Sequence, residues 1–103
     1  MLTQLLVLAI VLLPVASLAA PRPASADVAI AKARSAALFK RATLSWEEAA
    51  KDRSVIMKIP NVVPLGGGVP LIAGGVGIGA IGVSGASSTK DDEIAQAGAK
   101  LIA

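Results

Sequence analysis

Two groups of residues have the types and spacing that a functional site would need. Gly77, Gly79 and Gly82 match the G-x-G-x-x-G pattern of dinucleotide-binding turns, in which glycines let the backbone approach a pyrophosphate. The acidic run at 91–93 supplies neighbouring carboxylates, the groups that hold hard metal ions or act as general acids. The chain has no His and no Cys, so zinc sites, thiol nucleophiles and imidazole bases are excluded for this chain alone.

The glycine pattern lacks the structural context of a nucleotide site. A dinucleotide-binding turn needs a helix directly after the glycines and then a second parallel strand, within a unit of roughly 30 residues. Here Gly82 is followed by the stretch VSGASS, and the next predicted helix starts only near Thr89, with the chain ending after it. We therefore interpret the spacing as a coincidence of composition.

The carboxylates are explained by the start of a helix. Thr89 is predicted to cap a helix over residues 90–103, which places Asp91, Asp92 and Glu93 in its first turn. The positive end of the helix dipole favours acidic side chains there. We assign these residues no catalytic role, and we predict no catalytic residue elsewhere in the chain.

The glycine-rich run 66–87 contains no charge and is compatible with a membrane helix. The uncharged stretch extends from Lys58 to Lys90, and its small residues are spaced as in packed transmembrane helices. However, the part between Pro70 and the polar residues that begin at Ser84 is shorter than the ~20 residues that span a bilayer. A membrane helix is therefore the weaker alternative.

A β-hairpin explains the same run better. Strands over 69–73 and 76–85 would flank Gly74–Gly75, a dipeptide that hairpin turns favour. In the second strand larger residues alternate with Gly77 and Gly79, so one face carries no side chains. A glycine-lined face indicates that a helix or a ligand approaches the backbone closely.

Two further helices are expected before the hairpin. The first covers residues 25–42, is capped by Ser25 and ends at the basic pair 40–41. Its apolar stripe is predicted to consist of Ile30, Ala33 and Ala37, with Leu38 beside them.

The second helix is short, about two turns, and is formed by the segment SWEEAAKDR. Ser45 and Glu48 have the spacing of a capping box, and Glu47 with Lys51 forms an i,i+4 pair of favourable polarity. The segment 54–64 is β-branched and contains prolines, which predicts a loop or a short extended piece.

Composition limits the chain to one small domain of 103 residues with one Trp, one Phe and no Tyr. A small core this poor in aromatic residues is marginal unless subunits associate, so we expect a homo-oligomer. The net charge of +3 is mild. No concentrated basic face with aromatic stacking residues is evident, so nucleic acid is not expected as a partner.

The first 26 residues contain a long apolar run with no charge before Arg22. They resemble a secretory signal, with cleavage expected after Ala19 or Ala26, although the basic segment that opens most signals is missing. A membrane anchor is the alternative, because residues 1–20 are long enough to span a bilayer; an unusual or misassigned start is a third. We expect a secreted or periplasmic protein, with membrane anchoring as the alternative.

The order of motifs resembles a known family. The segments PASADVAIAKARSAALF and PLGGGVPLIAGGVGIGAIGVSGASSTKDDEIAQAGA are similar to the C-terminal part of the GlcG/HbpS family of haem-binding and haem-uptake or haem-degradation proteins. The resemblance covers residues 23–103. It includes the Ala-rich helix with Lys32 and the GGVP turn at 67–70.

The resemblance implies a profilin-like α/β (α+β) domain, an antiparallel sheet with helices on both faces. It also implies that the opening helix and two strands of the family domain are missing here, so that 1–26 is a leader and 27–103 a partial domain. For function, it implies an exported, oligomeric, non-catalytic haem-binding or haem-uptake protein, with a membrane sensor as partner in some members. The alternatives are a protein that assists haem or small-molecule degradation, or a non-functional fragment.

The family's haem suggests a few site residues in this chain. Thr43 and Met57 are the candidates for the iron side, although Met57 is better explained as a buried core residue. Backbone amides of Gly66, Gly67 and Gly68 would lie near a haem propionate, since irregular glycine loops form anion-binding concavities. A purely structural turn is the alternative for this glycine triplet.

Overall fold

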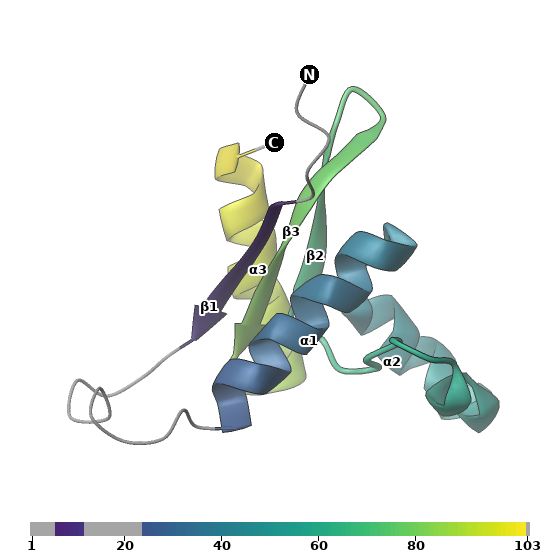
Figure 1. Ribbon diagram of the computed structural model, residues 1–103. Helices are drawn as coiled ribbons and strands as arrows, with labels where there is room; N and C mark the ends of the chain where they lie inside the picture. Colours follow the sequence, from purple (N-terminus) through teal and green to yellow (C-terminus); the bar gives the residue numbers. More distant parts are fainter. Residues whose placement is uncertain (1–5, 12–23, 103) are drawn as a thin grey trace.

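The structure is a computed structural model that describes residues 6–11 and 24–102. It is an α+β domain in which helices flank a three-stranded sheet (Figure 1). The elements are β1 (Leu6–Val11), α1 (Ala24–Phe39), α2 (Thr43–Asp52), the 3₁₀ helix η2 (Ser54–Lys58), β2 (Gly68–Ala73), β3 (Val76–Ser84) and α3 (Ser88–Ile102). Among the described residues no helix combines the length and apolar character that crossing a membrane requires.

The predicted hairpin is confirmed. β2 and β3 pair antiparallel and are joined by Gly74 and Gly75, whose φ angles of 57° and 78° are the left-handed values that a tight hairpin turn requires. The ladder shifts by one residue between Leu71 and Ile72, where a bulge changes which side chains face each side. The alternative of a membrane helix over this run is therefore wrong.

The third strand lies within the expected leader. β1 pairs parallel with β3, and the strand order is β1-β3-β2, which leaves β2 at an edge. The rest of the leader lies outside the described residues, and whether it is cleaved stays a prediction.

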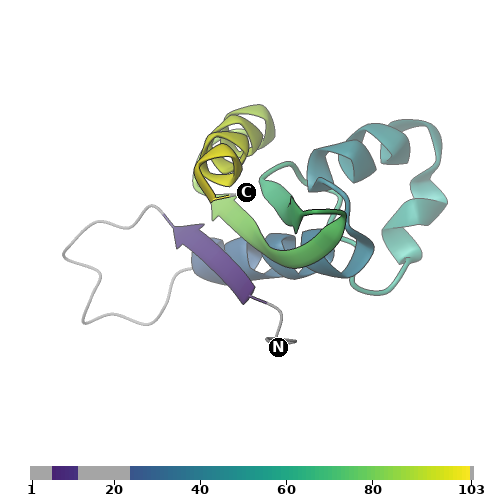
Figure 2. The same cartoon turned by 90° about the horizontal axis from the view of Figure 1, so that it is seen from above.

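The sheet lies between two helices, as predicted (Figure 2). On one face Ala33 and Ala36 of α1 pack on Ala80. On the other face Ala95 of α3 packs with Ile81 and other apolar residues of the hairpin. Alternation along β3 thus sends small residues toward α1 and large residues toward α3.

Glycine permits the close approach of α1, but not at the positions expected. A Cβ on Gly82 would overlap the carbonyl oxygen of Ala29, and a Cβ on Gly68 would overlap that of Lys32. At Gly77, by contrast, the nearest atoms belong to the side chain of Lys40, 3.5 Å away. The closest backbone approach of α1 is therefore at the end of the hairpin away from its turn, where Gly68 pairs with Gly82.

The details of α1 differ from the prediction. The helix begins at Ala24, so Ser25 lies inside it and is not the cap. The buried stripe is rotated by about one position from the predicted one, and Leu38 is exposed. Its buried members are Ala26, Ala29, Lys32, Ala33, Ser35 and Ala36.

The local pairings predicted for α2 are wrong. The helix starts at Thr43 after an N-cap Ala42 that forms no side-chain hydrogen bond, so Ser45 is not the first residue of a capping box. Lys51 pairs with Glu48 at 3.0 Å rather than with Glu47. Glu47 instead accepts a hydrogen bond from the backbone amide of Gly66.

The cap of α3 lies two residues earlier than expected, at Ser87 rather than Thr89. The Ser87 hydroxyl accepts a hydrogen bond from the amide of Lys90 at 3.2 Å, the geometry of an N-cap, while Thr89 lies within the helix. The predicted helix itself is confirmed.

Candidate functional site

A shallow cleft of about 360 Å³ lies beside the edge strand β2. The α1–α2 turn borders it on one side and α3 on the other. Its lining residues are Lys40, Arg41, Ala42, Val69, Pro70, Ile72, Gln96, Ala99 and Lys100. The volume falls in the range of small-molecule sites, about 300–1,000 Å³.

The lining of the cleft is cationic and contains no acidic residue. Lys40 and Arg41 approach from the α1–α2 turn and Lys100 from the last turn of α3. Within residues 6–11 and 24–102, no ion pair is formed between these three cations and a carboxylate. The cleft is therefore suited to an anion, and carboxylates and phosphates are the groups that Lys and Arg bind best.

Lys40 is placed by the end of α1. Its φ of 51° is left-handed, and the amide of Arg41 bonds back to the carbonyl oxygen of Ala36 at 3.3 Å, which closes the helix in the manner of a Schellman motif. The methylene stem of Lys40 then lies along Gly77 of β3, where no side chain displaces it. The backbone geometry at the end of α1 thus fixes the direction in which the Lys40 side chain leaves the helix.

Arg41 is held by a small aromatic cluster. Its guanidinium lies 3.9 Å from the ring centroid of Trp46, a cation–π arrangement. Trp46 in turn makes an edge-to-face contact with Phe39 at 5.4 Å. Arg41 Nε also donates to the Ser45 hydroxyl at 2.6 Å, so the only two aromatic residues of the chain support one basic side chain of the cleft.

The floor of the cleft is apolar. Val69, Pro70 and Ile72 come from β2 and Ala99 from α3. Pro70 is tolerated because β2 is an edge strand, and Ile72 is 41% exposed. Basic sides over an apolar floor suit a ligand with an apolar body and anionic groups.

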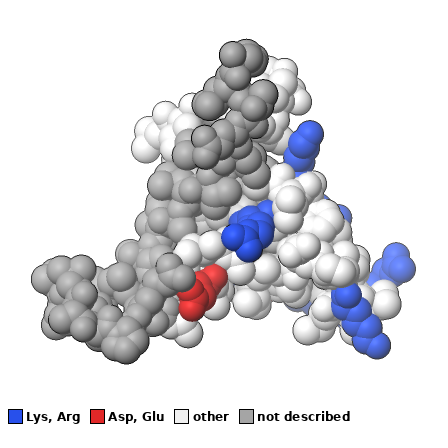
Figure 3. Space-filling view, viewed as in Figure 1, with Lys and Arg blue, Asp and Glu red and all other residues white. Residues whose placement is uncertain are grey.

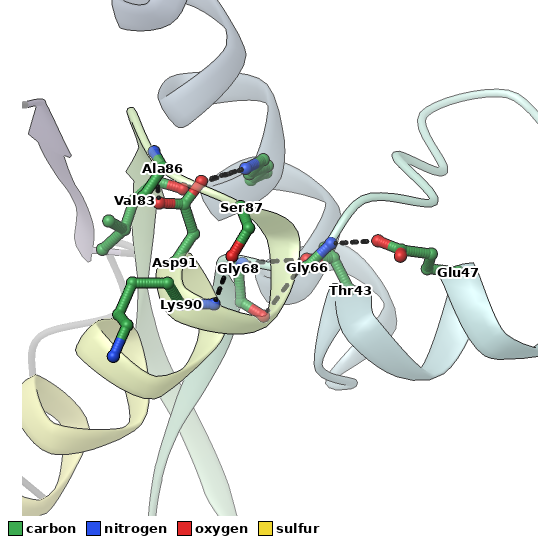
Figure 4. A network of polar contacts seen from close by, with 10 residues as sticks. Thr43, Glu47, Gly66, Gly68, Val83, Ala86, Ser87, Lys90 and Asp91 are labelled. Carbon is green, nitrogen blue, oxygen red and sulfur yellow. Dashed lines mark hydrogen bonds and ion pairs between the residues drawn. The ribbon is translucent and has the colours of Figure 1, made fainter.

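Thr43 is fully buried and lies beneath β2 (Figure 4). Its hydroxyl oxygen accepts a hydrogen bond from the amide of Gly68 at 2.8 Å and lies 3.5 Å from the carbonyl oxygen of the same residue. The contact ties the start of α2 to the start of β2. Thr43 does not line the cleft, and its role toward iron stays a prediction.

The glycine triplet is also engaged within the protein. The amide of Gly66 donates to the Glu47 carboxylate at 2.8 Å (Figure 4). Gly67 has a φ of 130°, and a side chain there would meet the Lys32 ammonium. Two of the three glycine amides thus have partners in the described chain, which supports the structural-turn interpretation; propionate binding by the triplet stays a prediction.

Met57 lies on η2 and is 65% exposed. The interpretation of Met57 as a core residue is therefore wrong, because η2 turns Ile56 inward in its place. Met57 does not line the cleft. The structure brings neither Met57 nor Thr43 to the cations described above.

A buried ion pair was missed by the sequence reasoning. Lys32 Nζ lies 3.2 Å from Asp91 Oδ2 and donates to the carbonyl oxygen of Val83 at 3.0 Å (Figure 4). Asp91 Oδ1 accepts a hydrogen bond from the amide of Ala86 at 2.9 Å. Lys32 is 3% and Asp91 1% exposed, so the pair links α1, β3 and α3 inside the fold. A lysine within a stripe of alanines was the available signal.

The three neighbouring carboxylates have different surroundings. Glu93 pairs with Lys90 at the surface. The pKa of the Asp92 carboxyl is raised, mainly because the group is partly buried. The nearby Glu93 adds to the rise, and a hydrogen bond with Gln96 opposes it. In the part of the chain that the structure describes, no three metal-ligating side chains come together.

One face of the molecule carries basic side chains that are dispersed. On the face seen in Figure 3 the basic side chains stand apart from one another rather than in a continuous band. Lys40, Arg41 and Lys100 line one cleft together.

These features define an α+β domain with a small basic and apolar cleft at a sheet edge. Residues 9–100 match the family model of the haem-degrading protein HbpS-like family, and the chain belongs to that family.

The chain is 41% identical over 63 residues to protein GlcG of Escherichia coli K12, an alignment that covers 60% of this chain and 47% of GlcG. Among solved structures, a Streptomyces reticuli HbpS double mutant has a TM-score of 0.69 at 28% identity, with 82% of this chain and 58% of HbpS covered. A PduOC:haem complex has a TM-score of 0.65 at 31% identity, with 77% and 61% covered. The chain thus spans about half the length of the curated relatives that it matches.

Proposed function

We propose that the protein is an exported haem-binding module with no catalytic residues of its own. The observation that carries the proposal is the cleft that joins three cations without acidic partners in the described chain to an apolar floor. Membership of the HbpS-like family and the similarity to a PduOC:haem complex support haem as the ligand. A role in haem uptake is part of the same proposal.

The cleft residues fit the carboxylates and the apolar ring of haem better than they fit its iron. The ammonium and guanidinium groups match its two carboxylates, and the residues of β2 and Ala99 match its apolar ring. The lining contains no His, Cys, Met or Tyr, the side chains that ordinarily hold haem iron. Binding through the periphery of the ring is therefore what these residues can provide.

Titration of the purified protein with hemin is expected to shift the Soret band with saturable stoichiometry and to quench Trp46, the only tryptophan. Lys100→Ala is expected to weaken hemin about tenfold, because one charge-assisted contact is lost. Lys58→Ala is the matched control, since Lys58 is exposed on η2 and does not line the cleft. Absence of any saturable Soret shift would contradict the proposal.

Export is proposed from the apolar run at 1–26. The mass of the protein recovered from cells is expected to correspond to a chain that begins at Ala20 or Asp27. Either cleavage would remove β1, and cleavage after Ala26 would also remove the first three residues of α1, including the buried Ala26. A full-length protein in the membrane fraction would indicate an anchor instead, and a full-length protein in the cytosol would contradict both.

Association into a homo-oligomer is proposed from the large apolar side chains that the described surface exposes. They include Val55, Met57, Leu65, Ile72, Val76 and Ile78. Light scattering during size-exclusion chromatography measures the oligomeric state directly. A membrane sensor as partner rests on the family resemblance alone, and crosslinking in intact cells would identify it.

Assistance in haem degradation is the second candidate function, because the matching family model is described as haem-degrading. Bound haem would supply the redox chemistry, and the protein would contribute binding and orientation. Loss of the Soret band in the presence of ascorbate and dioxygen, faster than for free hemin, would favour it over simple binding.

A further inference from the structure

We propose that the cleft recognises the carboxylates and the apolar face of a planar tetrapyrrole without a protein bond to the metal, so that metal-free porphyrin binds as well as haem. This inference rests on the proposed function and specifies its ligand class. Three observations carry it: the chemistry of the lining, the placement of the charges, and the positions of the residues that do have metal-binding atoms.

The lining offers no good ligand for iron. Of its nine residues, Ala42, Val69, Pro70, Ile72 and Ala99 are apolar, and the three basic residues carry positive charge that opposes a metal cation. Gln96 is the remaining polar side chain, and its neutral amide is a weak ligand for iron compared with imidazole or thiolate. The absence of His and Cys from the whole sequence removes the strongest alternatives.

The residues with other donor atoms lie elsewhere. The Thr43 hydroxyl is buried and engaged with Gly68. The thioether of Met57 is on η2, outside the lining. Neither side chain is among the residues that line the cleft beside β2.

The charges are arranged for two anionic groups. Lys40 and Arg41 stand at the α1–α2 turn, and Lys100 stands across the cleft on α3. Arg41 is restrained by Trp46 and Ser45, so one side of the cleft is preorganised. The two propionates of a porphyrin project from one edge of the ring, so one can meet Lys40 and Arg41 and the other Lys100 while the apolar remainder lies on the floor, whichever metal the ring holds.

The test compares ferric protoporphyrin IX, its zinc complex and metal-free protoporphyrin IX by quenching of Trp46 fluorescence. We expect dissociation constants within about threefold of one another, since all three ligands share the same carboxylates. Lys40→Gln and Lys100→Gln should each weaken all three ligands about tenfold, and Lys58→Gln should not. Circular dichroism checks that these exposed positions leave the fold intact.

The outcomes separate this inference from the proposed function. If hemin binds and metal-free porphyrin binds more than about thirtyfold more weakly, a metal bond carries the affinity and the inference is wrong while haem binding stands. If both bind but the two cleft variants behave like wild type, the site is elsewhere and the inference is also wrong. If hemin itself fails to bind, both are overturned.

Discussion

Replacing Asp91 with alanine is expected to lower the free energy of unfolding by about 3–5 kcal/mol, the range for breaking one half of a buried ion pair. The ammonium group of Lys32 would then be left buried, with the carbonyl oxygen of Val83 as its remaining partner among the described residues. The amide of Ala86 would lose its acceptor as well. Because small domains are only about 5–15 kcal/mol stable, Asp91→Ala should lose much of its native population at 37 °C. Urea denaturation followed by circular dichroism measures the change.

Glu93→Ala provides the matched control, because Glu93 belongs to the same helix turn but forms a surface pair with Lys90. Its effect should stay below about 1 kcal/mol. The double variant Lys32→Met with Asp91→Leu should be less destabilised than Asp91→Ala, since no charge is left buried. Equal free energies of unfolding for Asp91→Ala and wild type would show that the ion pair does not stabilise the packing of α1 against α3.

Gly82→Ala is expected to destabilise the fold by about 3 kcal/mol, the upper part of the range for overpacking. The added Cβ would overlap the carbonyl oxygen of Ala29 and meet Ala33, both in α1. Backbone cannot move aside as a flexible side chain can, so α1 would have to separate from the sheet. Thermal unfolding and the exposure of apolar surface to a fluorescent dye would report the change.

Gly77→Ala is the control for this prediction. It lies on the same strand, has no left-handed φ, and the atoms nearest an added Cβ belong to the flexible Lys40 side chain, 3.5 Å away. We expect a change within about 0.5 kcal/mol, as for ordinary surface substitutions. Comparable losses for Gly77→Ala and Gly82→Ala would mean that the strand does not tolerate a side chain at either position, and that the contact with Ala29 is not what makes glycine necessary at position 82.

Local patterns predicted much of this protein from its sequence. The hairpin follows from a Gly74–Gly75 turn between short apolar runs, and the helices follow from periodicity and polar starts, because these signals act over a few neighbouring residues. The family resemblance, carried by the order of these motifs, also anticipated helices on both faces of the sheet. The failures were the strand β1 and local details such as the caps at Ser25 and Thr89, because the exact end of a helix is specified less strongly by sequence pattern than the helix itself.

The tertiary structure alone decided the placement of charge. Lys32 and Asp91 are 59 positions apart, and Glu47 reaches Gly66 across 19 positions, so no short-range pattern could pair them. Lys40, Arg41 and Lys100 likewise meet only because α1 and α3 cover opposite faces of one small sheet and both end near its open edge. The sequence by itself predicted the three α-helices, the hairpin and the family, but neither the strand β1 nor the 3₁₀ helix η2. Which side chains face one another depended on packing over long separations, and the candidate site is made from those contacts.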